Sequence, residues 1–93
     1  MKAIYRDQVI AESDDALYFD GNYYFPPDAL DLRFVKPSDH TSTCPWKGRA
    51  SYHHVVVDGM QNDNAIWFYP NPNTAAATIQ GRVAFWRGVR VVE

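Results

Sequence analysis

The sequence predicts one small, mainly β domain spanning residues 1–93, and three observations support this prediction. Aromatic residues make up 15% of the chain, and aromatic and β-branched side chains favour strands over helices. Gly, Pro, Asn and Asp recur at short intervals, a pattern typical of short strands joined by tight turns. A length of 93 residues suits a single domain. We therefore expect about eight short strands, arranged as a twisted pair of antiparallel sheets or an open barrel.

The first third of the chain contains two predicted hairpins. The clearer one surrounds Asp20-Gly21, a dipeptide favoured in two-residue type I′ turns. Pro26-Pro27 ends the strand that follows, because proline cannot donate a hydrogen bond to a sheet. One turn of helix is expected next, at Asp28–Leu32. The strands expected here are Lys2–Arg6, Val9–Glu12, Ala16–Phe19, Asn22–Phe25 and Leu32–Val35.

The middle of the chain is predicted to hold a loop followed by the longest hairpin. Residues 36–48 are a loop by composition, with two prolines, several hydroxyl residues and a glycine. Loops of about 12 residues in compact domains are commonly functional. The longest strand is expected at Arg49–Val57, followed by a turn at Asp58–Asn64 and a returning strand at Ala65–Tyr69. Side chains alternate between the two faces of a strand, so Trp67 and Tyr69 share one face.

The last part of the chain is predicted to contain one short helix and a final hairpin. The helix is expected near residues 74–80, where three alanines favour it and Gly81 ends it. The hairpin would pair Arg82–Trp86 with Val89–Val92 around Arg87-Gly88.

Charge and cysteine content restrict the location and the partners. Nine basic and eleven acidic residues give a net charge of −2, which argues against a nucleic-acid partner. Residues 37–93 hold five of the basic residues and four of the acidic ones, a weak indication of tolerance for an anionic ligand. The single cysteine favours a reducing compartment, and no run reaches the roughly 20 apolar residues of a membrane span. Residues 1–11 include no apolar signal core, so we expect a cytoplasmic protein without a membrane partner.

Cys44 and the three histidines are the candidates for catalysis or metal binding. Cys44 lies near Lys47, a cation that could lower the pKa of the thiol; the alternative is an inert side chain in a tight loop. His53 and His54 are neighbours on a predicted strand, so they point to opposite faces and do not predict a metal site. No Gly-rich phosphate loop or zinc-protease motif is present, and we expect neither metal nor cofactor.

The aromatic residues around the predicted loop indicate a binding pocket. Tyr52 and Trp67 lie on adjacent predicted strands and would form a cross-strand pair if they share a face. Trp46 precedes that hairpin, and the rings together would stack on a planar or cationic ligand. Lys47 and Arg49 could bind a phosphate or carboxylate. The alternative is that these rings fill the core and both cations are ordinary surface charges.

Several strings resemble a bacterial and fungal family called domain of unknown function 427. They are STCPWKGRASY at residues 42–52, NAIWFYP at 64–70 and IQGRVAFW at 79–86, together with Tyr24-Phe25-Pro26. The CPWKG segment is specific, and the resemblance covers nearly the whole chain. The family also carries a nucleotidyltransferase-like label, although the chain has neither a phosphate loop nor paired metal-binding aspartates.

The resemblance implies a β-tent architecture, in which two antiparallel sheets lean together at an angle. Several proteins of similar architecture hold a zinc ion through two Cys-x-x-Cys pairs, which a chain with Cys44 alone cannot provide. The thalidomide-binding domain of cereblon, another such fold, uses an aromatic cage for a cyclic imide. Trp46, Tyr52 and Trp67 resemble that cage in type.

Three functions are compatible with these residues. The preferred one is binding of a small molecule, of unknown identity, in an aromatic pocket between the CPWKG loop and the following hairpin. The alternatives are an enzyme that uses Cys44 or a histidine, and a homo-oligomeric interaction module such as a homodimer. The candidate ligand-binding residues are Thr43, Cys44, Trp46, Lys47, Tyr52, Trp67 and Tyr69.

Overall fold

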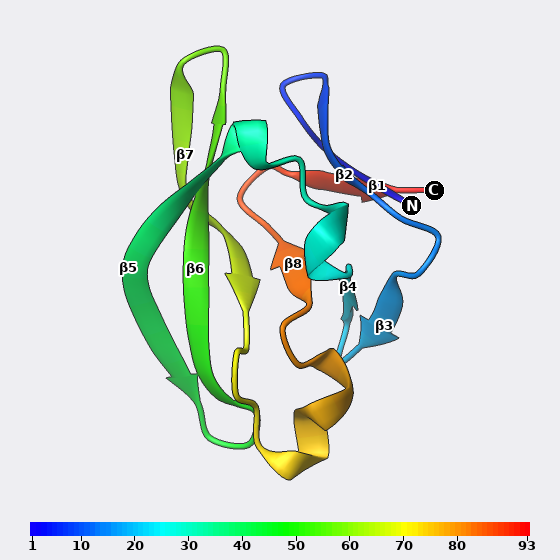
Figure 1. Ribbon diagram of the computed structural model, residues 1–93, viewed down its shortest axis with the longest axis vertical. Helices are drawn as coiled ribbons and strands as arrows, with labels where there is room; N and C mark the ends of the chain where they lie inside the picture. Colours follow the sequence, from blue (N-terminus) through cyan, green and yellow to red (C-terminus); the bar gives the residue numbers. More distant parts are fainter.

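Nine strands form three antiparallel sheets in the computed structural model, which describes residues 1–93 (Figure 1). Three short 3₁₀ helices join them, and no barrel closes. The predicted mainly β class is therefore confirmed. The expected pair of sheets corresponds to a four-stranded sheet and a three-stranded sheet, and a separate hairpin forms the third.

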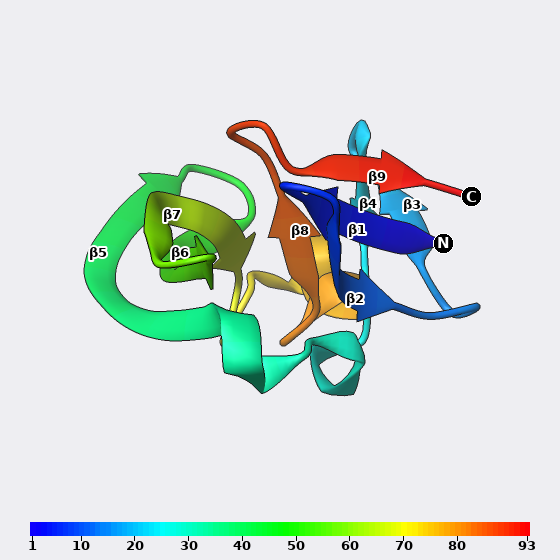
Figure 2. The ribbon, with the colours of Figure 1, turned by 90° about the horizontal axis from the view of Figure 1, so that it is seen from above.

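The three-stranded sheet joins the two ends of the chain. It consists of β1 (Lys2–Tyr5), β2 (Gln8–Glu12) and β9 (Arg90–Val92), with β1 in the centre. Lys2 lies opposite Val92, so the N- and C-terminal strands are neighbours, as both ribbon views show (Figure 2).

The two-stranded sheet is the hairpin predicted around Asp20-Gly21. It pairs β3 (Leu17–Phe19) with β4 (Asn22–Tyr24). Asp20 has φ 49° and Gly21 has φ 85°, the two positive values that a type I′ turn requires. After β4, Phe25 exchanges backbone hydrogen bonds of 2.8 and 2.9 Å with Val83, which anchors the hairpin to the larger sheet.

Two 3₁₀ helices follow, η1 (Pro27–Ala29) and η2 (Leu32–Phe34). The helical turn expected at Asp28–Leu32 lies close to η1, but the strand predicted at Leu32–Val35 is wrong. Asp31 accepts a hydrogen bond of 3.1 Å from the backbone N–H of Arg33 and forms an ion pair with its guanidinium. This side-chain cap stabilises a helical turn where alternation predicted a strand.

Residues 36–44 belong to a ten-residue strand, so the predicted loop is wrong over most of its length. Strand β5 (Val35–Cys44) pairs with β6 (Gly48–Val57), leaving only the turn 45–47 between them. β5 lies at the edge of the sheet and is mostly exposed, with a bulge between Pro37 and Thr41. Polar residues and proline are common on edge strands, and for this reason the segment has the composition of a loop. Figure 2 shows β5 as a wide arc.

The predicted central hairpin is present but longer than expected. β6 pairs with β7 (Met60–Phe68), and Asp58-Gly59 alone forms the turn. Residues 60–64 were expected to be part of the turn but continue the strand beyond the rest of the sheet (Figure 1). A bulge lies in this pair near Asn64, whose φ is 55°. The strand could not be predicted here because neither face of this extension is fully buried, so its sequence is polar and lacks apolar alternation.

The predicted short helix occupies the expected place as a 3₁₀ helix, η3 (Thr74–Ile79). It is kinked at Ala76, where φ is −117°. Gly81 follows with φ 71°, and its N–H donates to the carbonyl of Tyr69 at 3.0 Å. The helix therefore folds back onto the end of β7.

The predicted final hairpin does not form, although its turn does. Arg87 and Gly88 have φ 55° and 86°, but β8 (Val83–Phe85) pairs with β7, whereas β9 pairs with β1. The chain thus passes from one sheet to the other at this turn. Local turn chemistry was predicted correctly, but the choice of strand partner depends on which distant apolar faces are available.

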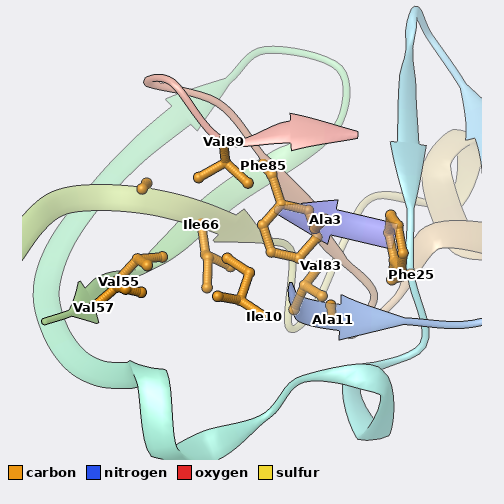
Figure 3. Close-up of a cluster of buried hydrophobic side chains, with 11 residues drawn as sticks. Ala3, Ile10, Ala11, Phe25, Val55, Val57, Ile66, Val83, Phe85 and Val89 are labelled. Atoms are coloured by element: carbon orange, nitrogen blue, oxygen red, sulfur yellow. The ribbon is translucent and has the colours of Figure 1, made fainter. Parts of the chain in front are cut away.

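Two hydrophobic clusters lie on opposite faces of the four-stranded sheet. The larger fills the space between this sheet and the three-stranded sheet, with side chains from both converging (Figure 3). The smaller lies beneath the β3–β4 hairpin and η3. All three residues of β8 are buried: Val83 and Phe85 join the larger cluster, and Ala84 joins the smaller. The smaller cluster forms the floor of the candidate site.

Candidate functional site

The β6–β7–β8 register places two aromatic residues side by side. Tyr52 on β6 lies opposite Trp67 on β7, and Trp67 lies opposite Ala84 on β8. Residues directly opposite each other in antiparallel strands share a face. The predicted cross-strand pair of Tyr52 and Trp67 is therefore confirmed. Tyr69 follows Trp67 by two residues and packs into the cluster on the same face.

The β3–β4 hairpin and the end of β8 contribute two further rings. Tyr24 is buried, and its hydroxyl accepts a hydrogen bond of 3.2 Å from Nε1 of Trp67. Trp86 packs edge-to-face on Trp67, with ring centroids 5.8 Å apart, and donates from Nε1 to the carbonyl of Asn64 at 2.6 Å. These contacts fix both rings, although Trp86 remains 42% exposed.

These rings border an open cavity of about 180 Å³, which we call the aromatic pocket. Five of its lining residues are aromatic and two are polar. They are Tyr24, Tyr52, Trp67, Tyr69 and Trp86, with Asn22 and Lys47. None of the three tryptophans of the chain is buried, so the tryptophan rings do not fill a dry core.

Lys47 supplies the only charged group of the pocket lining. Its side chain is 12% exposed, and its ammonium group contacts the carboxylate of Asp20 at the tip of the β3–β4 hairpin. The same Nζ lies 4.9 Å from the ring centroid of Trp46. Burial disfavours the charge, but the hydrogen bond to Asp20 and the proximity of Tyr69 outweigh it, so the pKa of Lys47 is raised. The ammonium group therefore stays protonated at physiological pH.

The buried tyrosines of the pocket remain neutral hydroxyls. Burial raises the pKa of Tyr24, although the hydrogen bond from Trp67 acts in the opposite direction. Burial also raises the pKa of Tyr69, against the smaller influence of Lys47. Each hydroxyl thus keeps its proton at physiological pH and can donate a hydrogen bond to a ligand.

Tyr52 is held at the margin of the pocket by polar neighbours on β5. Its hydroxyl is 2.8 Å from Oγ of Ser42, and its ring lies 4.7 Å from the ring of His40. The edge strand β5 therefore positions one wall of the site without contributing to its lining.

The sequence-predicted site residues divide into two groups. Lys47, Tyr52, Trp67 and Tyr69 line the pocket. Thr43, Cys44 and Trp46 do not: Thr43 is an exposed residue of β5, and Trp46 is 44% exposed with its ring centroid 5.8 Å from that of Phe19.

Cys44 ends β5 beside the pocket rather than within its lining. It is half-buried and packs against the smaller hydrophobic cluster. The backbone N–H groups of Lys47 and Trp46 in the adjoining turn lower the pKa of the Cys44 thiol. The β5–β6 turn thus increases the thiolate fraction relative to an unperturbed cysteine.

Sequence reasoning missed three lining residues, Asn22, Tyr24 and Trp86. Tyr24 and Trp86 both belong to strings on which the family resemblance rests, which was a usable signal. Asn22 directly follows the predicted Asp20-Gly21 turn, and its position carries no comparable signal.

The histidines contact different partners. His53 stacks on Phe68, with centroids 4.7 Å apart, whereas Nδ1 of His54 accepts the backbone N–H of Asn64 at 3.0 Å. No three His, Cys, Asp or Glu side chains lie close enough together to hold a metal ion. No helix is long and apolar enough to cross a membrane.

The fold and the site define a small, mainly β protein with an open pocket lined by five aromatic residues, one lysine and one asparagine. The chain belongs to the family described as domain of unknown function (DUF427), whose model matches residues 1–93. A comparison with curated proteins found no match.

Proposed function

We propose that residues 1–93 form a single small-molecule binding domain whose site is the aromatic pocket. The observation that carries this proposal is that Lys47 and five aromatic residues line one open cavity. Ligand sites are commonly concave and mostly apolar, with a few polar groups that fix orientation. The pocket has this composition.

Each lining group has a proposed role. Trp67 and Trp86 stack on or flank the planar part of the ligand, because their edge-to-face packing leaves ring surface open to the cavity. The hydroxyl groups of Tyr52 and Tyr69 contact polar atoms of the ligand, with Tyr24 and Asn22 as further donors. The ammonium group of Lys47 donates a hydrogen bond to an acceptor oxygen of the ligand.

We also propose a cytoplasmic location, which the single unpaired cysteine supports.

Catalysis through Cys44 is the second candidate, favoured by the lowered pKa of its thiol. The pocket gives it less support because Cys44 does not line the cavity. Lys47, which does, stays protonated and so is a poor nucleophile. Iodoacetamide alkylation rates measured against pH would reveal a reactive thiolate, and slow alkylation with an ordinary pKa would eliminate the cysteine mechanism.

Tryptophan fluorescence tests the binding proposal, because two of the three tryptophans line the pocket and one does not. We expect at least one compound in a panel of nucleotides, amides and cyclic imides to give a saturable change. Trp86→Phe should reduce that change, whereas Trp46→Phe, outside the lining, should preserve it. Tyr69→Phe should weaken binding about threefold to tenfold through loss of one hydrogen bond.

Circular dichroism of each variant serves as the folding control. Absence of a saturable response across the panel would count against the proposal. So would a response that disappears in Trp46→Phe and survives in Trp86→Phe, since that pattern places the ligand outside the aromatic pocket.

A further inference from the structure

The charges around the aromatic pocket are asymmetric. One basic residue, Lys47, and no acidic residue line the cavity. Rings of this kind attract cations through their π faces. Here Lys47 is itself such a cation, with Nζ 4.9 Å from the ring centroid of Trp46. A second cation in the cavity would meet like-charge repulsion, so the lining favours an anionic or neutral ligand.

The hydrogen-bonding groups of the lining reinforce this preference. Trp67 and Trp86 already use their Nε1–H groups within the protein. The hydroxyl groups of Tyr24 and Tyr69 keep their protons and can donate them. Lys47 is donor-only, with three N–H bonds. A ligand oxygen that accepts several hydrogen bonds satisfies these groups together.

Lys47 already forms an ion pair with Asp20. Its carboxylate contacts the ammonium group from the tip of the β3–β4 hairpin, and it is 47% exposed and does not line the cavity. The ammonium group of Lys47 thus already forms an ion pair with a carboxylate within the protein. Because Asp20 is partly exposed, water can solvate it after a ligand anion replaces it.

The size of the cavity limits the part of the ligand that lies inside it. A closed cavity of about 150 Å³ holds one benzene ring, and sites for drug-sized ligands occupy about 300–1,000 Å³. The aromatic pocket, at about 180 Å³, has room for one ring and a small substituent.

We infer that the pocket selects a planar, single-ring carboxylate, whose carboxylate group is bound by Lys47 in exchange for Asp20. This inference rests on the proposed binding function and adds the charge, size and shape of the ligand. Asp20 acts as an internal competitor that holds the place of the ligand's anionic group.

A matched set of probes tests the charge and shape of the ligand separately. Benzoate, benzamide and benzylamine share one ring and differ in charge, and cyclohexanecarboxylate keeps the charge but loses planarity. Titration of the three indole N–H resonances by NMR would give the affinities. We expect benzoate to bind most tightly, about tenfold more so than benzamide, with benzylamine and cyclohexanecarboxylate weaker still.

Two variants change the charge at Lys47 in opposite ways. Lys47→Met should weaken benzoate binding about tenfold and weaken benzamide binding far less, because the amide carbonyl accepts a hydrogen bond without carrying a charge. Asp20→Asn should tighten benzoate binding severalfold, because the competitor loses its charge. Asn is favoured at this turn position, where φ is 49°, so Asp20→Asn keeps the hairpin folded even if Lys47→Met unfolds.

The outcomes separate this inference from the proposed function. The inference is overturned if benzamide or benzylamine binds as tightly as benzoate. It is also overturned if Asp20→Asn binds benzoate more weakly than the native protein does. In both cases the pocket remains a binding site. No shift with any of the four probes also overturns the inference. Only the additional failure of the wider panel would remove the proposed function as well.

Discussion

His53 is the one residue with a buried side-chain polar atom that lacks a hydrogen-bond partner, its Nδ1. Its ring stacks on Phe68, and burial lowers its pKa, with a smaller contribution from His54. The imidazole is therefore kept neutral, since protonation would place a charge beside an apolar ring without a partner.

We expect His53 to make the free energy of unfolding depend on pH. Its folded-state pKa lies below the unfolded value of about 6.5, so its stabilising contribution is complete above that pH. It is lost as pH falls through the folded-state pKa, because the unfolded chain binds the proton more readily. Urea unfolding at pH 7.5 and 5.5 should show a smaller loss of stability for His53→Phe than for the native protein. An identical loss in both would contradict this account.

Some residues of the aromatic pocket could be assigned to it from the sequence, and others could not. Tyr52 and Trp67 were predicted as a pair because alternation and one hairpin suffice to place them together. Tyr24 and Trp86 come from outside that hairpin, and only the packing of other elements brings them to the same cavity. The Lys47–Asp20 contact likewise links two turns that are distant in sequence.

The β5–β6 turn is the element that positions Lys47. The loop after β7 holds it, since Asn73 donates from its backbone N–H to the carbonyl of Lys47 at 2.8 Å and from its amide to the carbonyl of Trp46 at 3.1 Å. Gly48 has a backbone φ of 113°, a conformation that residues with a side chain rarely adopt. The turn thus depends on glycine at this position.

Gly48→Ala is expected to destabilise the protein by about 1–3 kcal/mol, the typical cost of one strained backbone position. A Cβ atom there would lie 3.5 Å from the carbonyl oxygen of Asn71, an ordinary contact, so the cost comes from backbone strain. Gly59→Asn is the control, because φ 72° suits Asn and no atom lies within 4 Å. Chemical denaturation measures both, and equal stability of the two variants would show that the Gly48 conformation is not required.

Elements defined by buried alternation or turn chemistry could be predicted from sequence, and exposed ones could not. β6 and the β3–β4 turn follow directly from such local patterns. β5 has polar residues on nearly all positions, and only its hydrogen bonds to β6 make it a strand. Asp31 similarly changed a short alternating segment into η2 through its side-chain cap.

At the scale of the whole molecule, Phe25 connects the sheets. Its backbone is paired with Val83, and its fully buried ring packs edge-to-face on Phe85 with centroids 5.3 Å apart. It belongs to the cluster that fills the space between the four-stranded and three-stranded sheets (Figure 3).

Phe25→Ala should therefore cost about 3–5 kcal/mol, the usual penalty for removing a buried ring. Proteins of this size are stable by only about 5–15 kcal/mol, so a large drop in melting temperature is expected. Tyr23→Ala removes a nearby, 37% exposed ring and should cost only about 1 kcal/mol, mainly through its contact with Tyr18. Thermal unfolding followed by circular dichroism compares them, and similar losses would refute the central role of Phe25.

Local patterns in the sequence suffice to predict the mainly β class, the Asp20-Gly21 turn and the β6–β7 pairing, and its motifs carry the resemblance to the family. The first three depend on interactions between neighbours or across one hairpin, where alternation and turn chemistry act directly. Three features required the complete fold: the pairing of β9 with β1, the strand conformation of β5, and the contribution of Tyr24 and Trp86 to the aromatic pocket. β5 is a strand through hydrogen bonds along an exposed edge, which its polar side chains do not indicate. The other two features join segments far apart in the chain, and such segments choose partners by the apolar surface that the whole fold buries.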